Sequence, residues 1–214
     1  EWETAADKAT LGAGTQVKTG PDGSATLVWG DGNALKLGPL SVITIDELSL
    51  DKAGGKSVSD FSMKQGKVLA LAQKMRTKDS AFNVKTPVAT AGVRGTAFEC
   101  NLPPDQPTQF TASVVEGEIM VQSQGVEVAV SVGLEVAVTM GQPPAEPAPI
   151  PPPRLNQLKT DSEGLKAEAQ EAAGQAQQQQ EKTEEKAEAE EEEQAPAPVE
   201  ETADEVVEQT TEEV

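Results

Sequence analysis

Few side chains in this sequence are of a kind that performs catalysis or binds metals. The 214 residues include no histidine, so the commonest general base and the commonest ligand of transition metals are absent. A single cysteine, Cys100, can form neither an intrachain disulfide nor a thiolate metal site on its own. Because Glu99 precedes it, we interpret Cys100 as a small buried apolar residue and not as a reactive thiol. The sequence therefore predicts no metal site and no cofactor.

Carboxylates are the remaining candidates for acid–base chemistry. Asp46 with Glu47, and Glu116 with Glu118, form pairs of the kind that glycoside hydrolases use. Adjacent residues on a strand point to opposite faces, whereas residues two apart share a face. Only Glu116 and Glu118 share a face by this rule, and Gly117 between them indicates a turn. We therefore expect that the chain is not an enzyme.

One arginine occupies an unusual position, inside the segment TPVATAGVRGTAFEC. Along an unbroken strand Arg94 lies on the same face as Phe98 and Cys100, which are expected to face the core. Either Gly95 opens a bulge that changes the facing, or Arg94 is partly buried and paired with an acid. The sequence leaves both explanations open.

The acid in the second explanation would be Glu116 or Glu99. In both cases Arg94 determines the fold. The functional alternative is that its planar guanidinium docks a carboxylate or a peptide.

The elements that position these residues are strands. Short segments of alternating apolar and polar residues recur over the first 141 residues, separated by turn signals such as PDG and GDGN. Apolar positions also recur eight residues apart, as at Leu27, Leu35 and Ile43, which suits a short strand followed by a tight turn. The pattern predicts an all-β sandwich, barrel or roll for residues 1–141.

The composition changes after residue 141. Residues 1–153 carry 12 Lys and Arg against 17 Asp and Glu (net −5), whereas residues 154–214 carry 5 against 19 (net −14). The many prolines of residues 142–154 predict a semi-rigid linker that packs into neither sheet nor helix. In the acidic, low-complexity tail at 155–214, residues Leu165–Gln194 contain strong helix formers but no apolar stripe, so we expect the tail to be largely disordered or marginally helical.

The charge and hydropathy of the whole chain limit its partners. Its net charge of −19 argues against nucleic acid and against an anionic membrane surface. No apolar run approaches the roughly 20 residues that span a bilayer, so no transmembrane segment is predicted.

The arginine segment and its flanks resemble the FecR-domain family. The motif is a Thr-Pro pair, a run of small residues, and then Val-Arg-Gly-Thr-x-Phe. The flanks that agree are GTQVKTGPDGSATLVWGDGNALKLGPLSVITI (Gly14–Ile45), MKQGKVLALA (Met63–Ala72) and VVEGEIMVQS (Val114–Ser123). The motif residues, with a structural or a docking role, are Thr86, Pro87, Val93, Arg94, Gly95, Thr96 and Phe98.

The resemblance implies a fold and a compartment. It implies an all-β, twisted, β-helix-like roll on the far side of the bacterial inner membrane, in the periplasm or cell envelope. The founding members relay a signal from an outer-membrane transporter to a cytoplasmic sigma factor. Here a proline-rich linker and an acidic tail follow the roll, so we expect a stand-alone domain without anti-sigma or membrane segments. Export would then depend on a signal that is removed and not present in this chain.

Two functions are compatible with this resemblance. The first is a non-catalytic protein-binding or signalling module, with strand edges and the region of Glu116 and Gly117 as the candidate interaction surface. The second is a structural subunit or scaffold of an envelope assembly, with the tail as a tether. The expected partners are envelope proteins, including further copies of this chain.

Overall fold

The computed structural model describes residues 2–193 except 31, 52–54, 75–76 and 94, and describes side chains as far as residue 175. Two compact units make up the chain, Glu1–Gln175 and Ala176–Val214. No helix in the described residues is long and apolar enough to cross a membrane.

Thirteen strands and one helix form the described structure. The strands are β1 (Gln16–Lys18), β2 (Ala25–Trp29), β3 (Asn33–Leu37), β4 (Val42–Asp51), β5 (Lys56–Leu71), β6 (Ala81–Lys85), β7 (Thr90–Val93), β8 (Ala97–Leu102), β9 (Gln109–Glu116), β10 (Glu118–Ser123), β11 (Val126–Ser131), β12 (Leu134–Thr139) and β13 (Ala148–Pro149); the helix is α1 (Pro152–Glu193).

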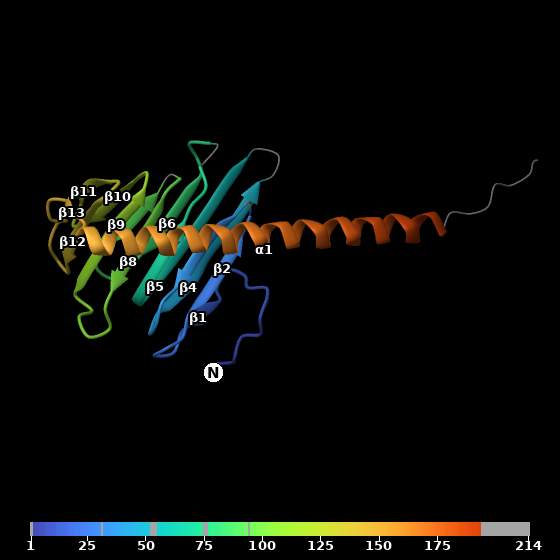
Figure 1. Ribbon diagram of the computed structural model, residues 1–214, viewed down its shortest axis with the longest axis horizontal. Helices are drawn as coiled ribbons and strands as arrows, with labels where there is room; N and C mark the ends of the chain where they lie inside the picture. The colour runs from blue at the N-terminus through green and yellow to red at the C-terminus, as the bar shows by residue number, and fades with distance from the viewer. Residues whose placement is uncertain (1, 31, 52–54, 75–76, 94, 194–214) are drawn as a thin grey trace, which may run out of the picture. The chain divides into compact units, whose positions relative to one another are not determined.

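The strands belong to one curled sheet organised around the long strand β5 (Figure 1). The first part of β5 pairs with β4 and, in parallel, with β6. Its second part, from Gly66 to Leu71, pairs with β3 and β8. From β5 one half of the sheet continues through β6, β7 and β10 to β11, and the other continues through β8, β9 and β12 to β13. Because β5 belongs to both halves, the sheet folds over on itself and encloses a core.

Apolar and polar residues alternate along the strands, and the apolar side chains fill this core. Leu27 and Leu35, eight residues apart in sequence, are opposite each other in the β2–β3 pair, which explains the eight-residue spacing. The aromatic rings meet in the centre, where Trp29 lies 5.1 Å from Phe61 between ring centroids and Phe82 packs against both. The prediction of an all-β roll of short strands is confirmed.

The proline-rich segment differs from its prediction. Ala148 and Pro149 form β13, which pairs with the start of β12, and Ile150 is buried and donates its backbone N–H to Gly133. Proline is compatible with a strand at the edge of a sheet, where its missing N–H faces away from the ladder. Pro152 then begins α1, a position where the missing N–H is also harmless. The statement that this segment packs into neither sheet nor helix is therefore wrong.

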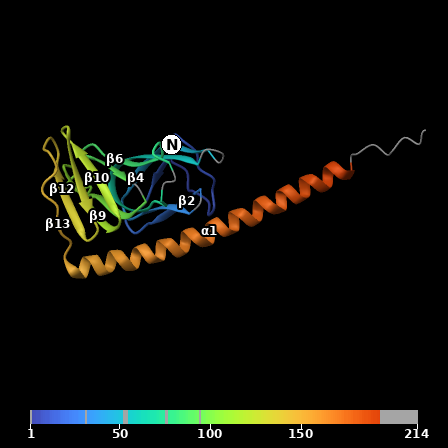
Figure 2. The same ribbon diagram turned by 90° about the horizontal axis from the view of Figure 1, so that it is seen from above.

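The first part of the predicted tail is helical, which is one of its two expected states, but this helix packs on the sheet. Leu158, Leu165 and Ala169 of α1 are buried against residues of the sheet. Figure 2 shows the start of α1 running along the outer side of the sheet. Their spacing of seven and four residues forms a narrow apolar stripe on one helix face. The surrounding sequence is rich in alanine and glutamine, so the stripe is difficult to recognise from the sequence alone. Residues 142–175 thus pack in one unit with the strands, beyond the predicted end of the β domain at residue 141.

Candidate functional site

The Thr-Pro pair of the motif builds a tight turn between β6 and β7. The Thr86 hydroxyl donates to the Ala89 carbonyl at 2.8 Å and accepts the backbone N–H groups of Val88 and Ala89. Pro87 is exposed at the tip, where its fixed φ suits the turn and its lack of an N–H is harmless. Both residues therefore contribute to this turn.

The next part of the motif carries the chain from one half of the sheet to the other. Strand β7 ends at Val93 and β8 begins at Ala97, so the strand assumed for the facing of Arg94 is interrupted. Val93 and Phe98 both face the core although they are five residues apart, which means that the facing changes between them. Gly95 has a φ of +72°, in the left-handed region that favours glycine. Arg94 itself lies outside the described residues.

We call residues 95–97 together with 116–117 the motif corner, because they meet where the two halves join. A Cβ added to Gly117 would lie 2.6 Å from Thr96 Cγ2 and 3.0 Å from the Gly95 carbonyl oxygen, so only glycine fits there. Ala97 is opposite Glu116, but the next residue, Phe98, is opposite Val114, which leaves Val115 as a bulge. The bulge turns Val115 away from the main core and toward α1.

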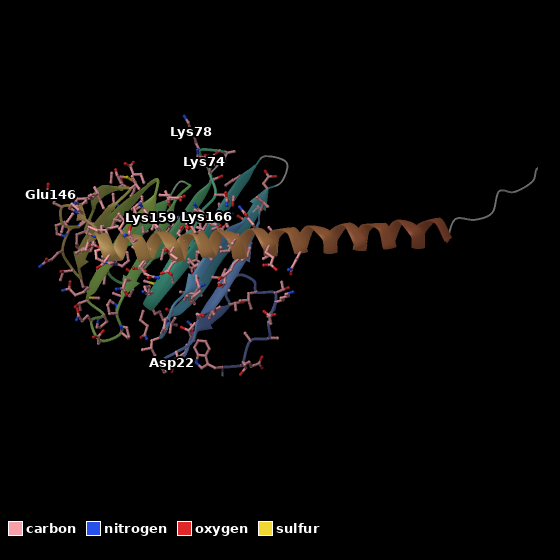
Figure 3. The ribbon with its side chains drawn as sticks, viewed as in Figure 1. Asp22, Lys74, Lys78, Glu146, Lys159 and Lys166 are labelled. Carbon is pink, nitrogen blue, oxygen red and sulfur yellow. The ribbon has the colours of Figure 1, made fainter. Side chains whose placement is uncertain are left out.

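Helix α1 covers the outer side of the motif corner. Its buried residues pack on a small second core formed by Ala34, Leu69, Leu71, Ala97, Val115 and Ile150. Lys166 pairs with Glu116, and it lies on the part of α1 that crosses the strands (Figure 3). Two buried hydroxyls in the described structure lack a hydrogen-bond partner: Thr96 in the corner and Ser162 on α1.

A charged cluster holds the start of α1. Arg154 donates to Glu135 at 2.6 Å, to Glu99 at 3.0 Å and to the Ser113 hydroxyl at 3.1 Å. Glu99 is only 5% exposed, and Lys67 approaches its other carboxylate oxygen at 3.6 Å. A buried carboxylate needs such partners, because leaving it unpaired is costly. Arg154 therefore fixes α1 to β8, β9 and β12 through one side chain.

A second polar contact holds α1 farther along. Glu168 accepts a hydrogen bond from Lys36 at 2.9 Å and another from Thr26 at 2.9 Å. The hydrogen bond from Lys36 is the main cause that lowers the pKa of Glu168 below its ordinary value. This region of α1 thus binds β2 and β3, and the helix spans both ends of the second core.

The carboxylates considered for acid–base chemistry are engaged elsewhere. Asp46 accepts a hydrogen bond from Ser62 at 2.6 Å, and Glu47 accepts one from Ser49 at 3.0 Å. Glu116 is paired with Lys166, as described above, and Glu118 accepts from Ser131 at 3.0 Å. Within the described residues, no group of His, Cys, Asp or Glu side chains is arranged to hold a metal ion.

Cys100 is fully buried in the main core, as its sequence context predicted. Burial is the main cause that raises the pKa of its thiol, and the neighbouring Glu99 adds to the shift. A buried thiol with a raised pKa has almost no thiolate at neutral pH, so it is not a nucleophile.

Sequence reasoning missed the residues that α1 contributes. Glu99 and Glu116 were considered as partners of Arg94, and in the structure both are bound by cations of α1. Arg154 was assigned to a linker. One signal could have shown its role: it is the last residue of the proline-rich segment, next to the first leucine of the helix.

A family model described as FecR protein matches residues 15–120. The chain carries a FecR domain. The domain includes the Thr86–Ala89 turn and the motif corner, whereas α1 lies outside the matched residues and covers the corner. The family resemblance predicted from the sequence is confirmed.

Solved structures share this fold. Two crystal structures of a protein from Parabacteroides distasonis, assigned as an anti-sigma factor, match at a TM-score of 0.52 and 17% sequence identity. The match covers 63% of this chain and 59% of theirs, so the FecR-domain chain corresponds to about three fifths of those proteins. At this identity the likeness establishes the fold alone. No curated protein matches the chain.

Proposed function

We propose that this FecR-domain chain is a non-catalytic, protein-binding signalling module of the bacterial periplasm or cell envelope. The FecR match over residues 15–120 carries the proposal, since FecR domains are regulatory and typically periplasmic. The anti-sigma assignment of the structural neighbours is consistent with a regulatory role. The engagement of the candidate carboxylates in hydrogen bonds and ion pairs supports a role in binding over catalysis.

The proposed contact surface is the turn at Glu116 and Gly117 together with the adjoining part of α1. The Glu116 side chain remains 53% exposed while paired with Lys166, so it is available to a partner. Gly117 lies close to Thr96 and has a positive φ, so no larger residue fits at this turn. A charged side chain that is exposed at a tight turn can contact a partner without a rearrangement of the backbone.

A charge swap tests this surface without removing the ion pair that holds α1. The double variant Glu116→Lys with Lys166→Glu retains the pair but reverses the charge that a partner meets. Asp22→Lys is the matched control, because Asp22 is also exposed and lies in a separate turn (Figure 3). The partner is first captured by crosslinking in the native envelope, then purified and titrated against each variant.

We expect the charge swap to weaken binding of the purified partner at least about tenfold, since one lost or reversed charge contact costs roughly 1.4 kcal/mol or more. The Asp22→Lys variant should bind as the wild type does. Equal binding by all three would refute the assigned surface. A stable assembly of many copies with no other bound protein would instead favour the structural-scaffold role.

A further inference from the structure

The edge strand β11 has the features of a self-pairing surface. The path of the curled sheet ends at β11 on one side and at β13 on the other, and β1 and β2 are further edges. β13 is two residues long and contains proline, and β1 is three residues long. β11 is six residues long and contains neither lysine nor proline, the residues that usually protect an edge.

The backbone of β11 presents its free groups on one side. The turn Gln124–Gly125 has φ values of +51° and +75°, typical of a two-residue hairpin that closes on a hydrogen-bonded pair, here Ser123 and Val126. Hydrogen-bonded pairs then alternate along the ladder, so Val126, Val128 and Val130 bond to β10. Glu127, Ala129 and Ser131 direct their N–H and C=O groups away from β10. In the described part of the chain no strand pairs with them.

Exposed apolar side chains mark the two ends of this edge. Val126 at its start is 45% exposed, and Val132 just after its end is 57% exposed. Exposed Met140 belongs to the segment that passes the hairpin, because the Gln142 carbonyl accepts a hydrogen bond from Ser123. By contrast, the apolar residues of β2, an edge strand of five residues, are partly buried against the core.

We propose that two copies of this chain dimerise by antiparallel pairing of β11 with β11. A two-fold axis at Ala129 places Ala129 opposite its copy and Glu127 opposite Ser131 of the second copy. The backbone N–H and C=O groups of all three outward-directed residues then form hydrogen bonds across the interface. About six backbone hydrogen bonds form in this register. It also places Val126 opposite Val132, so the two exposed valines at each end cover one another.

This register avoids the charge conflict that a shifted one would create. The β11 strand carries one charged residue, Glu127, and in the proposed register it faces a serine hydroxyl instead of another carboxylate. Shifting the axis to Glu127 would place two carboxylates opposite each other and destabilise the pair. The inference goes beyond the proposed signalling function, because a monomer or a dimer could bind a regulator at Glu116.

Cysteine crosslinking on the full chain tests the register. Paired residues at the axis have Cα atoms about 5.5 Å apart, within the range that a disulfide spans. Ala129→Cys should therefore form a disulfide-linked dimer under mild oxidation. Glu127→Cys is the matched control, since the two copies of residue 127 would be about 14 Å apart. Native Cys100 is fully buried and should not interfere.

Sedimentation velocity over a range of concentrations gives the second measurement. The wild type should dimerise, more strongly as salt is added, because added salt screens the repulsion between copies that each carry a net charge of −19. Ala129→Pro removes an N–H that β10 does not use, so it should preserve the melting temperature and raise the dimer dissociation constant at least about tenfold.

Three results would overturn the proposal. One is a wild type that stays monomeric up to its solubility limit. Another is crosslinking of Glu127→Cys as readily as Ala129→Cys. The third is a monomer that binds an extended peptide of another protein at β11 and loses it in Ala129→Pro, which would assign the edge to a different occupant.

Discussion

Removing the Arg154 guanidinium should release the start of α1. The variant Arg154→Met retains most of the aliphatic stem but eliminates three hydrogen bonds, to Glu135, Glu99 and Ser113. Glu99, 5% exposed, then keeps only the more distant Lys67 as an ionic partner. Breaking a fully buried ion pair costs about 3–5 kcal/mol.

The expected cost here is smaller than that for a fully buried pair. The Arg154 side chain is 37% exposed, and water can partly replace it. We therefore expect a loss of about 2 kcal/mol in the free energy of unfolding. For a folded unit of this size, that corresponds to a fall in melting temperature of about 4–8 °C.

Calorimetry or thermal circular dichroism measures this change. Lys159→Met is the matched control, because Lys159 lies on the same helix, is exposed, and forms no ion pair in the described structure. Adding Glu99→Gln to Arg154→Met should recover part of the loss, since it removes the charge left unpaired. If Arg154→Met melts within about 1 °C of Lys159→Met, the hydrogen bonds of Arg154 contribute nothing measurable to the stability of the fold, and the reasoning is wrong.

Three further predictions concern the corner, the core and the helix. Gly117→Ala should destabilise the chain by roughly 1–3 kcal/mol more than Gly133→Ala, because both glycines have a positive φ but only Gly117 would clash with Thr96; equal melting temperatures would contradict this. The free energy of unfolding should fall by up to about 1.4 kcal/mol per pH unit above roughly pH 8.5, where the unfolded Cys100 thiol ionises and the buried one stays protonated; urea titrations of Cys100→Ala should lose this slope. Limited proteolysis should leave a resistant fragment that extends to about residue 175, so a fragment ending near residue 141 would show that α1 does not dock.

Much of the β domain could be predicted from the sequence. Strand alternation and turn residues depend on neighbours within a few positions. The sequence alone therefore predicts strands such as β2, β3, β9 and β10. The motif from Thr86 to Phe98 identified the family for the same reason, because its turn at Thr86–Pro87 is formed by local hydrogen bonds.

The segment around Gly95 shows what such reasoning leaves open. The two-residue period of a strand holds only while the strand is continuous. Near Gly95 the chain passes from one half of the sheet to the other, and this passage interrupts the strand. A glycine in the sequence is compatible with a bulge, a turn or a corner, and the choice depends on which strands pair on each side. The structure makes this choice through the β5–β8 and β7–β10 pairings.

The sequence by itself determined the all-β class, the turns, the buried cysteine and the FecR family, because each is encoded by short-range pattern. Only the tertiary structure decided that the proline-rich segment and the start of the acidic tail belong to the folded unit. Three small or branched apolar residues on α1 are too sparse a signal in sequence, and they bind only because the sheet provides a matching surface. Arg154 likewise meets Glu99 across 55 residues of chain, a contact that the curl of the sheet creates and that no local pattern encodes.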